Sequence, residues 1–295
     1  MNNIVANFEE IFRFAKNYGL PPEKKRAIVR EYLQTKILSF VYQEKISKNL
    51  FFVGGTALRI LRGLDRFSED LDFDAVKIKN TQIKELILTV VGRLERENIN
   101  TELYQNVTPK KSFYELRFPN LLAKLQLSPN TSEKLMVKLD IESFWQGQKR
   151  ETIFVNRYGF LATVVTKSLE QVAVEKLVAY LVRKETQPRD LYDLVWLLSR
   201  GIKPDLNFAK ENHLPADLLG KAQKKFILEQ KFLARYKTKL RPFLFDERQV
   251  NRLDFFEELI RQVQSPACRQ AGKSSVRTYR FGQKDREADC RNGKK

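Results

Sequence analysis

The sequence has few of the side chains on which much enzyme chemistry depends: two cysteines and one histidine among 295 residues. Cys268 and Cys290 lie close together near the C-terminus. This arrangement excludes a disulfide scaffold and a zinc cluster. Any reaction that needs a histidine base has only His213, which stands in a loop-like stretch and is expected at the surface.

Long apolar runs are missing as well. No segment approaches the roughly 18 consecutive apolar residues of a membrane-spanning helix. Residues 1–4 lack the charged and then apolar pattern of a signal peptide. We therefore expect a cytoplasmic protein with no membrane partner. Its 42% hydrophobic and 31% charged residues are typical of a globular chain.

Positive charge is the first feature that points to a partner. The chain has 54 basic and 36 acidic residues, a net charge of +18. Residues 265–295 hold nine basic and three acidic residues, so residues 1–264 still carry +12. A basic folded body favours a polyanion such as a nucleotide or RNA. Because residues 265–295 offer few apolar side chains, we predict a disordered basic tail to which we assign no role.

The spacing of apolar residues predicts an α+β fold in two parts. In the first part, helices are predicted at 4–17, 22–46, 56–62 and 81–96, and strands at 51–53, 68–74, 101–107, 112–118, 135–143 and 151–157. In the second part, Ser168 and Gln171 form a capping-box signal for a helix that runs to about residue 184. Further helices are predicted from Pro188 to Gly201 and at 215–240 and 247–263. The predicted domains are 1–165, 166–264 and the tail, 265–295.

A pair of glycines ends the first predicted strand, and a threonine opens the helix that follows. Gly54 and Gly55 let a phosphate approach the backbone, and the helix that starts at Thr56 offers free N–H groups and a positive dipole end. Alone, such a turn is a weak signal.

Acidic residues alternate along the strand predicted at 68–74. Asp70 and Asp72 fall on one face of that strand, close enough to share a divalent cation. Magnesium takes one or two carboxylates together with substrate phosphates. A strand of alternating acids can also be a plain solvated face, but here it directly follows a phosphate-binding turn. The combination is typical of nucleotidyl transfer, and Ser68 is a further candidate for contact with the nucleotide.

Metal chemistry of this kind usually needs a third carboxylate. Asp140 and Glu142 fall on the polar face of the strand predicted at 135–143. We choose Asp140 as the third metal ligand and as the base that accepts a proton from the attacking hydroxyl. The spacing does not separate it from Glu142.

The helical half offers cations that could bind phosphates. Lys176 stands at the edge of an apolar helix face, where it could reach a triphosphate or only extend to solvent. Arg183 and Arg189 follow, and Asp193 lies nearly one turn inside the next helix. Asp190, at the start of that helix, is explained by the helix dipole alone.

Five segments in consistent order resemble the AbiEii nucleotidyltransferase-like toxins of the DNA polymerase β-type nucleotidyltransferase superfamily. They are residues 54–58, 66–73, 138–141, 175–177 and 189–194. The resemblance spans roughly residues 30–200. It implies a small mixed sheet flanked by helices, with a helical domain that forms the other wall of a cleft. It also implies a toxin of a type IV toxin–antitoxin or phage-defence system, with a cognate antitoxin as partner.

The resemblance also implies a role for individual residues. Gly55 and Thr56 would hold the nucleotide phosphates, with Thr56 in place of the serine common in the wider superfamily. Asp70 and Asp72 would bind magnesium, and Asp140 would complete the metal site. Lys176 would contact the triphosphate, and Arg189 and Asp193 would belong to the last motif.

The leading hypothesis is a nucleotidyltransferase with two magnesium ions, for which manganese is a possible substitute. It would move NMP from an NTP to a hydroxyl of RNA, with the 3′ end of tRNA as the expected acceptor, and would need no histidine. A second hypothesis is transfer of NMP to a protein side chain. A third is a non-enzymatic module that binds nucleotide or RNA. The residues do not identify the NTP, the acceptor, the antitoxin or the oligomeric state.

Overall fold

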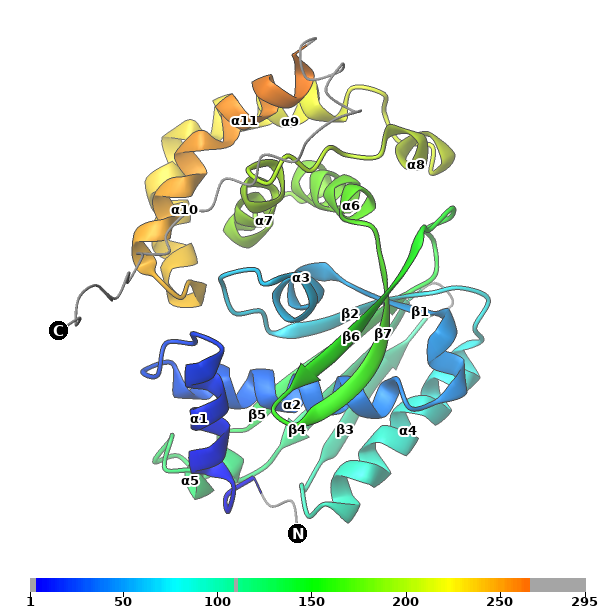
Figure 1. The fold of residues 1–295 in the computed structure, drawn as a ribbon, viewed down its shortest axis with the longest axis vertical. Helices are drawn as coiled ribbons and strands as arrows, with labels where there is room; N and C mark the ends of the chain where they lie inside the picture. Colours follow the sequence, from blue (N-terminus) through cyan, green and yellow to red (C-terminus); the bar gives the residue numbers. More distant parts are fainter. Residues whose placement is uncertain (1–3, 109–110, 266–295) are drawn as a thin grey trace, which may run out of the picture.

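The computed structural model describes residues 4–108 and 111–265 (Figure 1). Its centre is a mixed five-stranded sheet of order β1-β2-β5-β4-β3, in which only β2 and β5 run parallel. The strands are β1 (Leu50–Val53), β2 (Asp70–Ala75), β3 (Glu102–Val107), β4 (Lys111–Phe118) and β5 (Leu135–Glu142). The predicted mixed sheet with flanking helices and a C-terminal helical region is confirmed.

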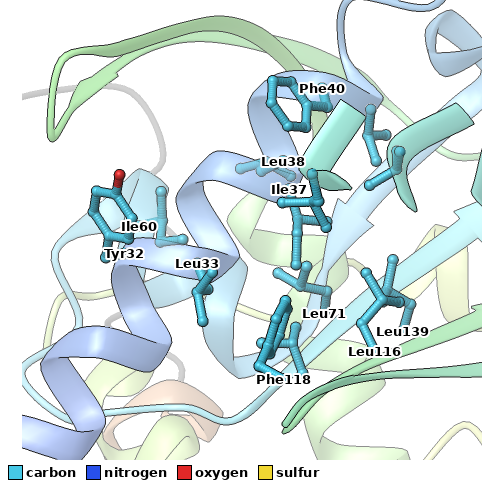
Figure 2. Close-up of a cluster of buried hydrophobic side chains, with 14 of the residues drawn as sticks. Tyr32, Leu33, Ile37, Leu38, Phe40, Ile60, Leu71, Leu116, Phe118 and Leu139 are labelled. Atoms are coloured by element: carbon cyan, nitrogen blue, oxygen red, sulfur yellow. The ribbon is translucent and has the colours of Figure 1, made fainter. Parts of the chain in front are cut away.

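Helices cover the apolar face of this sheet. They are α1 (Phe8–Asn17), α2 (Lys25–Val41), α4 (Asn80–Arg96) and the short α5 (Leu121–Lys124), with a 3-10 turn, η1, at Lys45–Asn49. Figure 2 shows Leu33, Ile37 and Leu38 of α2 close to Leu71 and Leu139 of the sheet, and all five are buried in one cluster. Because side chains alternate along a strand, the aspartates that flank Leu71 point to the opposite face.

A long hairpin that the sequence analysis predicted only in part follows the sheet. It pairs β6 (Arg150–Arg157) with β7 (Phe160–Lys167), and only β6 was predicted. Tyr158 and Gly159 form the turn with φ angles of 53° and 78°, as a two-residue turn of type I′ requires. The Thr166 hydroxyl donates to the carbonyl of Phe52, which ties β7 to β1.

Within residues 168–265, the regular elements of the C-terminal part are all helices. Its elements are α6 (Leu169–Val182), α7 (Pro188–Leu198), α8 (Leu206–Glu211), α9 (Leu218–Glu229), η2 (Gln230–Phe232), α10 (Leu233–Leu240), η3 (Arg241–Phe243), η4 (Glu247–Phe255) and α11 (Phe256–Gln264). As predicted, the Ser168 hydroxyl caps α6 by accepting from the Gln171 N–H. The stretch 215–240 was predicted as helix without a break, and α8 was not predicted.

Two clusters of buried apolar side chains stabilise these parts. One lies between the sheet and helices α1, α2 and α4. The other lies among α6 to α11 and includes Leu58 of α3 (Gly54–Arg62) and the nearby Leu64. In Figure 1, α6 and α7 lie between the sheet and an outer layer of α9, α10 and α11. The helices of the described residues include none with the length and apolarity that a membrane span requires. The predicted tail, apart from Ser265, lies outside the described residues.

Candidate active site

One cleft of about 420 Å³ brings most of the predicted site residues together. Its floor comes from β1, β2 and β5, and its opposite wall comes from α6 and the start of α7. Nine predicted residues line it: Gly54, Gly55, Ser68, Asp70, Asp72, Asp140, Lys176, Arg183 and Arg189. Thr56 and Asp193 are not in its lining, because both are buried behind it. The volume suits a ligand of nucleotide size.

Strand register places the three predicted metal ligands side by side. The parallel pairing of β2 with β5 sets Asp72 opposite Asp140, with Asp70 and Glu142 two residues away on the same face. On the other side, Val53 at the end of β1 pairs with Asp72. The sequence predicted which face each carboxylate occupies, whereas the lateral alignment comes from the pairing of strands 60 or more residues apart.

The glycine pair lies against these acids. Gly54 has a φ of +76°, and a Cβ atom there would lie 2.0 Å from Oδ2 of Asp72. A Cβ on Gly55 would lie 2.6 Å from Nη2 of Arg66 and 2.8 Å from Oγ of Ser68. Any larger residue would displace the side chains of the cleft floor. The glycines are therefore needed for packing as well as for backbone approach.

Thr56 has a structural partner of its own. Its buried hydroxyl donates to the backbone carbonyl of Asp70, which fixes the start of α3 against the start of β2. The nucleotide contact predicted for Thr56 would therefore use its backbone N–H rather than this hydroxyl.

Burial and neighbouring acids disfavour negative charge on strand β2. Burial, helped by the carboxylates of Asp70 and Asp140, raises the pKa of Asp72 to about 7 against the opposing effect of Lys176. Burial also raises the pKa of Asp70. A bound cation would offset these effects.

A buried ion cluster supports Lys176 on the opposite wall. Arg66 donates to Asp193 through Nε at 2.7 Å and Nη2 at 2.6 Å, and Lys176 Nζ lies 2.8 Å from Asp193 Oδ2. Burial alone would lower the pKa of Lys176, but Asp193 and Asp190 raise it. Conversely, burial alone would raise the pKa of Asp193, but Arg66 and Lys176 hold it below its usual range. Lys176 therefore stays charged beside the cleft.

The two predicted arginines line the cleft at the junction of α6 and α7. Arg183 Nη1 donates to Asp190 Oδ2 at 2.5 Å, and Asp190 also lies 3.3 Å from Lys176 Nζ. Arg189 Nη1 donates to Glu69 at 3.1 Å, and its guanidinium lies 4.5 Å from the centre of the Phe243 ring. Both guanidinium groups are partly exposed and could exchange a carboxylate for a phosphate.

The cleft also contains charged residues that the sequence analysis did not select. Lys111 of β4 lies 2.9 Å from Asp140 and 3.0 Å from Glu142. At the inner end, the fully buried Lys167 pairs with Asp74 and Glu175. Apart from the contact of Lys167 with Glu175, eight positions away, these contacts join residues far apart in sequence, which no local spacing could indicate. Arg66, by contrast, stood inside the quoted motif at 66–73 and could have been selected.

The donor set fits a hard divalent cation held together with a substrate. Carboxylate oxygens are the ligands that magnesium and manganese prefer, and Asp70, Asp72 and Asp140 offer them on one face. Within residues 4–108 and 111–265, no three acidic, histidine or cysteine side chains already surround a single point. Phosphate oxygens of a bound nucleotide would therefore have to complete the coordination.

Known structures share this fold. JHP933 from Helicobacter pylori aligns with a TM-score of 0.50 and 22% identity over 81% of this chain and 93% of its own. A second Helicobacter pylori protein, described as a nucleotidyltransferase, aligns with a TM-score of 0.52 and 22% identity over 81% of this chain and 96% of its own. MenT4, a nucleotidyltransferase toxin from Mycobacterium tuberculosis, aligns with a TM-score of 0.47 and 19% identity over 87% of this chain and 99% of its own. At these identities the likeness to the two Helicobacter pylori structures concerns the fold alone, and no argument rests on the third. No curated protein matches the sequence.

The fold is that of the nucleotidyltransferase toxins. A family model described as "Nucleotidyl transferase AbiEii toxin, Type IV TA system" matches residues 38–272. Since the match covers most of the sequence, the chain belongs to the AbiEii nucleotidyltransferase toxin family, which confirms the resemblance seen in its motifs.

Proposed function

We propose that this chain transfers a nucleoside monophosphate from an NTP to a hydroxyl of RNA, with the 3′ end of tRNA as the expected acceptor. One observation carries the proposal: Asp70, Asp72 and Asp140 line the same cleft as Lys176 and Arg189. Acids that bind a cation and cations that bind phosphate are both required for phosphoryl chemistry. We expect the chain to act in the cytoplasm as the toxin of a pair with a cognate antitoxin.

Each wall of the cleft has its own task in this reaction. Asp70, Asp72 and Asp140 would hold two magnesium ions, which when bound activate the attacking oxygen and stabilise the leaving oxygen. Lys176 and Arg189 would bind and orient the triphosphate. Asp140, with Glu142 as the alternative, would accept the proton of the attacking hydroxyl. The acceptor oxygen then bonds to the α-phosphorus, and pyrophosphate leaves.

The mouth of the cleft offers a surface for the nucleobase. Phe144, Val178 and Val182 line it, and Phe144 and Val182 are 53% and 71% exposed. A nucleotide has a charged end and a flat aromatic end. The cleft provides a charged floor and an apolar rim to match.

The test is to incubate the full chain with each α-labelled NTP, magnesium and total tRNA, beside the Asp70→Ala/Asp72→Ala variant. Label in nuclease-sensitive material, absent with the variant, supports the proposed reaction. Label that resists nuclease and yields to protease would favour transfer to protein. If no NTP gives label and the Asp70→Ala/Asp72→Ala variant still binds RNA, the proposed enzymatic transfer is overturned in favour of a non-enzymatic binding module.

A further inference from the structure

Positive charge is concentrated in one part of the helical region. Residues 218–241, which form α9, η2, α10 and the first residue of η3, contain eight lysines and arginines and one acidic residue, Glu229. Their net charge of +7 is more than half of the +12 that residues 1–264 carry. The other 240 residues of 1–264, ten times as many, hold only +5.

The helices turn most of these cations outward. Leu218, Ala222, Phe226, Tyr236 and Leu240 are buried on the inner side. The outer side is exposed and presents five basic residues at intervals of three to seven: Lys221, Lys224, Lys231, Arg235 and Lys239. We call these five residues the basic stripe. None of them forms an ion pair with an acidic residue in the part of the chain that the structure describes. Their charge is therefore not offset within this part of the chain.

The helices that carry the stripe pack against the outer side of the cleft wall formed by α6 and α7. Lys225 Nζ donates to the carbonyls of Tyr180 at 2.6 Å and Arg183 at 3.2 Å, and the Thr186 hydroxyl donates to Glu229 at 2.7 Å. These bonds join the end of α9 to the segment that brings Arg183 into the cleft. Figure 1 shows α9 and α10 on the outside of α6 and α7, in the layer farthest from the sheet.

We infer that the basic stripe binds the phosphate backbone of the RNA acceptor while its reacting end lies in the cleft. This inference rests on the proposed function. Cations spaced along a helix face neutralise a polyanion without reading its bases. An extended acid such as RNA fits five cations in a row that lack carboxylate partners.

The test compares two variants of the full chain with the same change in charge. Lys224→Gln/Lys231→Gln/Arg235→Gln removes three of the five positive charges of the basic stripe. Lys45→Gln/Lys84→Gln/Arg96→Gln neutralises exposed cations of η1 and α4, for which the structure likewise gives no ion pair. Affinity for labelled total tRNA is measured without NTP or metal at several salt concentrations, and NTP affinity is measured separately.

The stripe variant should bind tRNA roughly tenfold or more weakly than the control at low salt. Its slope of log affinity against log salt should be shallower by about two to three, since each lost phosphate contact removes about 0.7–0.9. NTP affinity should stay unchanged. Equal tRNA affinity and equal salt slope in the two variants would overturn the inference. A protein partner would then be the alternative occupant of this surface, because Leu228 beside the stripe is 74% exposed.

The outcome also separates this inference from the proposed reaction. If the chain binds tRNA through the stripe but transfers no label, the inferred RNA-binding surface is supported and the proposed reaction is contradicted. If the stripe variant labels tRNA with an unchanged KM, the proposed reaction is supported and the inferred RNA-binding surface is contradicted.

Discussion

Lys176 acts on both Asp72 and Asp193, but the other surroundings of these two aspartates have opposite effects on their pKa values. Asp193 is completely buried between Arg66 and Lys176, which hold its pKa below the usual range. Asp72 lies on the cleft floor among other acids, and its pKa is raised to about 7. Asp193 is fully paired with cations and stabilises the wall, whereas Asp72 has too little positive charge around it to balance the neighbouring acids. The difference indicates where an added cation would bind.

The largest effect should follow from removal of the Asp72 charge. In Asp72→Asn we expect the rate of nucleotide transfer to fall about 1,000-fold, because loss of metal-assisted stabilisation costs several kcal/mol and each 1.36 kcal/mol is tenfold in rate. The rate is measured with α-labelled NTP and tRNA. Glu85→Gln, the same loss of charge on the exposed side of α4, should leave it unchanged. Transfer within tenfold of the wild type would contradict the role of Asp72.

Opening the paired cluster should reduce stability instead. Arg66→Met leaves Asp193 buried with only Lys176 beside it, and loss of one partner of a buried pair costs about 3–5 kcal/mol. We expect the free energy of unfolding, measured in urea, to fall by about this amount. Arg13→Met breaks an exposed pair with Glu10 and should change stability by less than about 1 kcal/mol. Similar losses of stability in both variants would mean that the buried cluster contributes no more to stability than the exposed pair does.

Local patterns in the sequence predicted the cleft floor well. The alternation in β2 and β5 assigned faces to Asp70, Asp72 and Asp140, and the Ser168 cap marked the start of α6. These features depend on neighbours a few residues apart, which a single sequence displays. The domain boundaries and the roles of individual site residues stay predictions.

Long-range contacts were not predictable in this way. Arg66 contacts Asp193 across 127 positions, and Lys167 contacts Asp74 across 93. No spacing rule connects such pairs, since the fold alone brings them together. Strand β7 was missed for another reason: its turn at Tyr158 and Gly159 lacks the asparagine or aspartate that commonly marks a two-residue hairpin.

The two aspartates should also respond to pH in opposite directions. A raised folded pKa, as for Asp72, gives stability that is present below about pH 4 and is lost as the pH rises to about 7. A lowered folded pKa, as for Asp193, gives stability that is present above about pH 4 and is lost as the pH falls further.

Unfolding in urea with a chelator should reveal the contribution of Asp72. Between pH 5 and 8, the decline in wild-type stability should exceed that of Asp72→Asn by at most about 3 kcal/mol, because about two pH units of the shift fall in this range. Contact of this carboxylate with cleft water should make the difference smaller. Equal declines in the two proteins would show that Asp72 ionises without cost. Asp193→Asn is the matched control, and its decline over this range should equal that of the wild type.

The smallest predicted effect is the gain in the free energy of unfolding on addition of magnesium, which should depend on the acids of the cleft floor and not on the Arg66–Asp193 cluster. A cation that binds the folded floor stabilises it by about 2.7 kcal/mol at a hundred times its dissociation constant. We expect this gain in the wild type and also in Arg66→Met, which keeps all three floor carboxylates, but little of it in Asp72→Asn. Urea unfolding with magnesium is compared with sodium chloride at equal ionic strength, because general screening would stabilise all three proteins alike. An equal magnesium gain in Asp72→Asn would place the cation away from the β2 carboxylates, and a gain lost in Arg66→Met would mean that floor and wall form one unit.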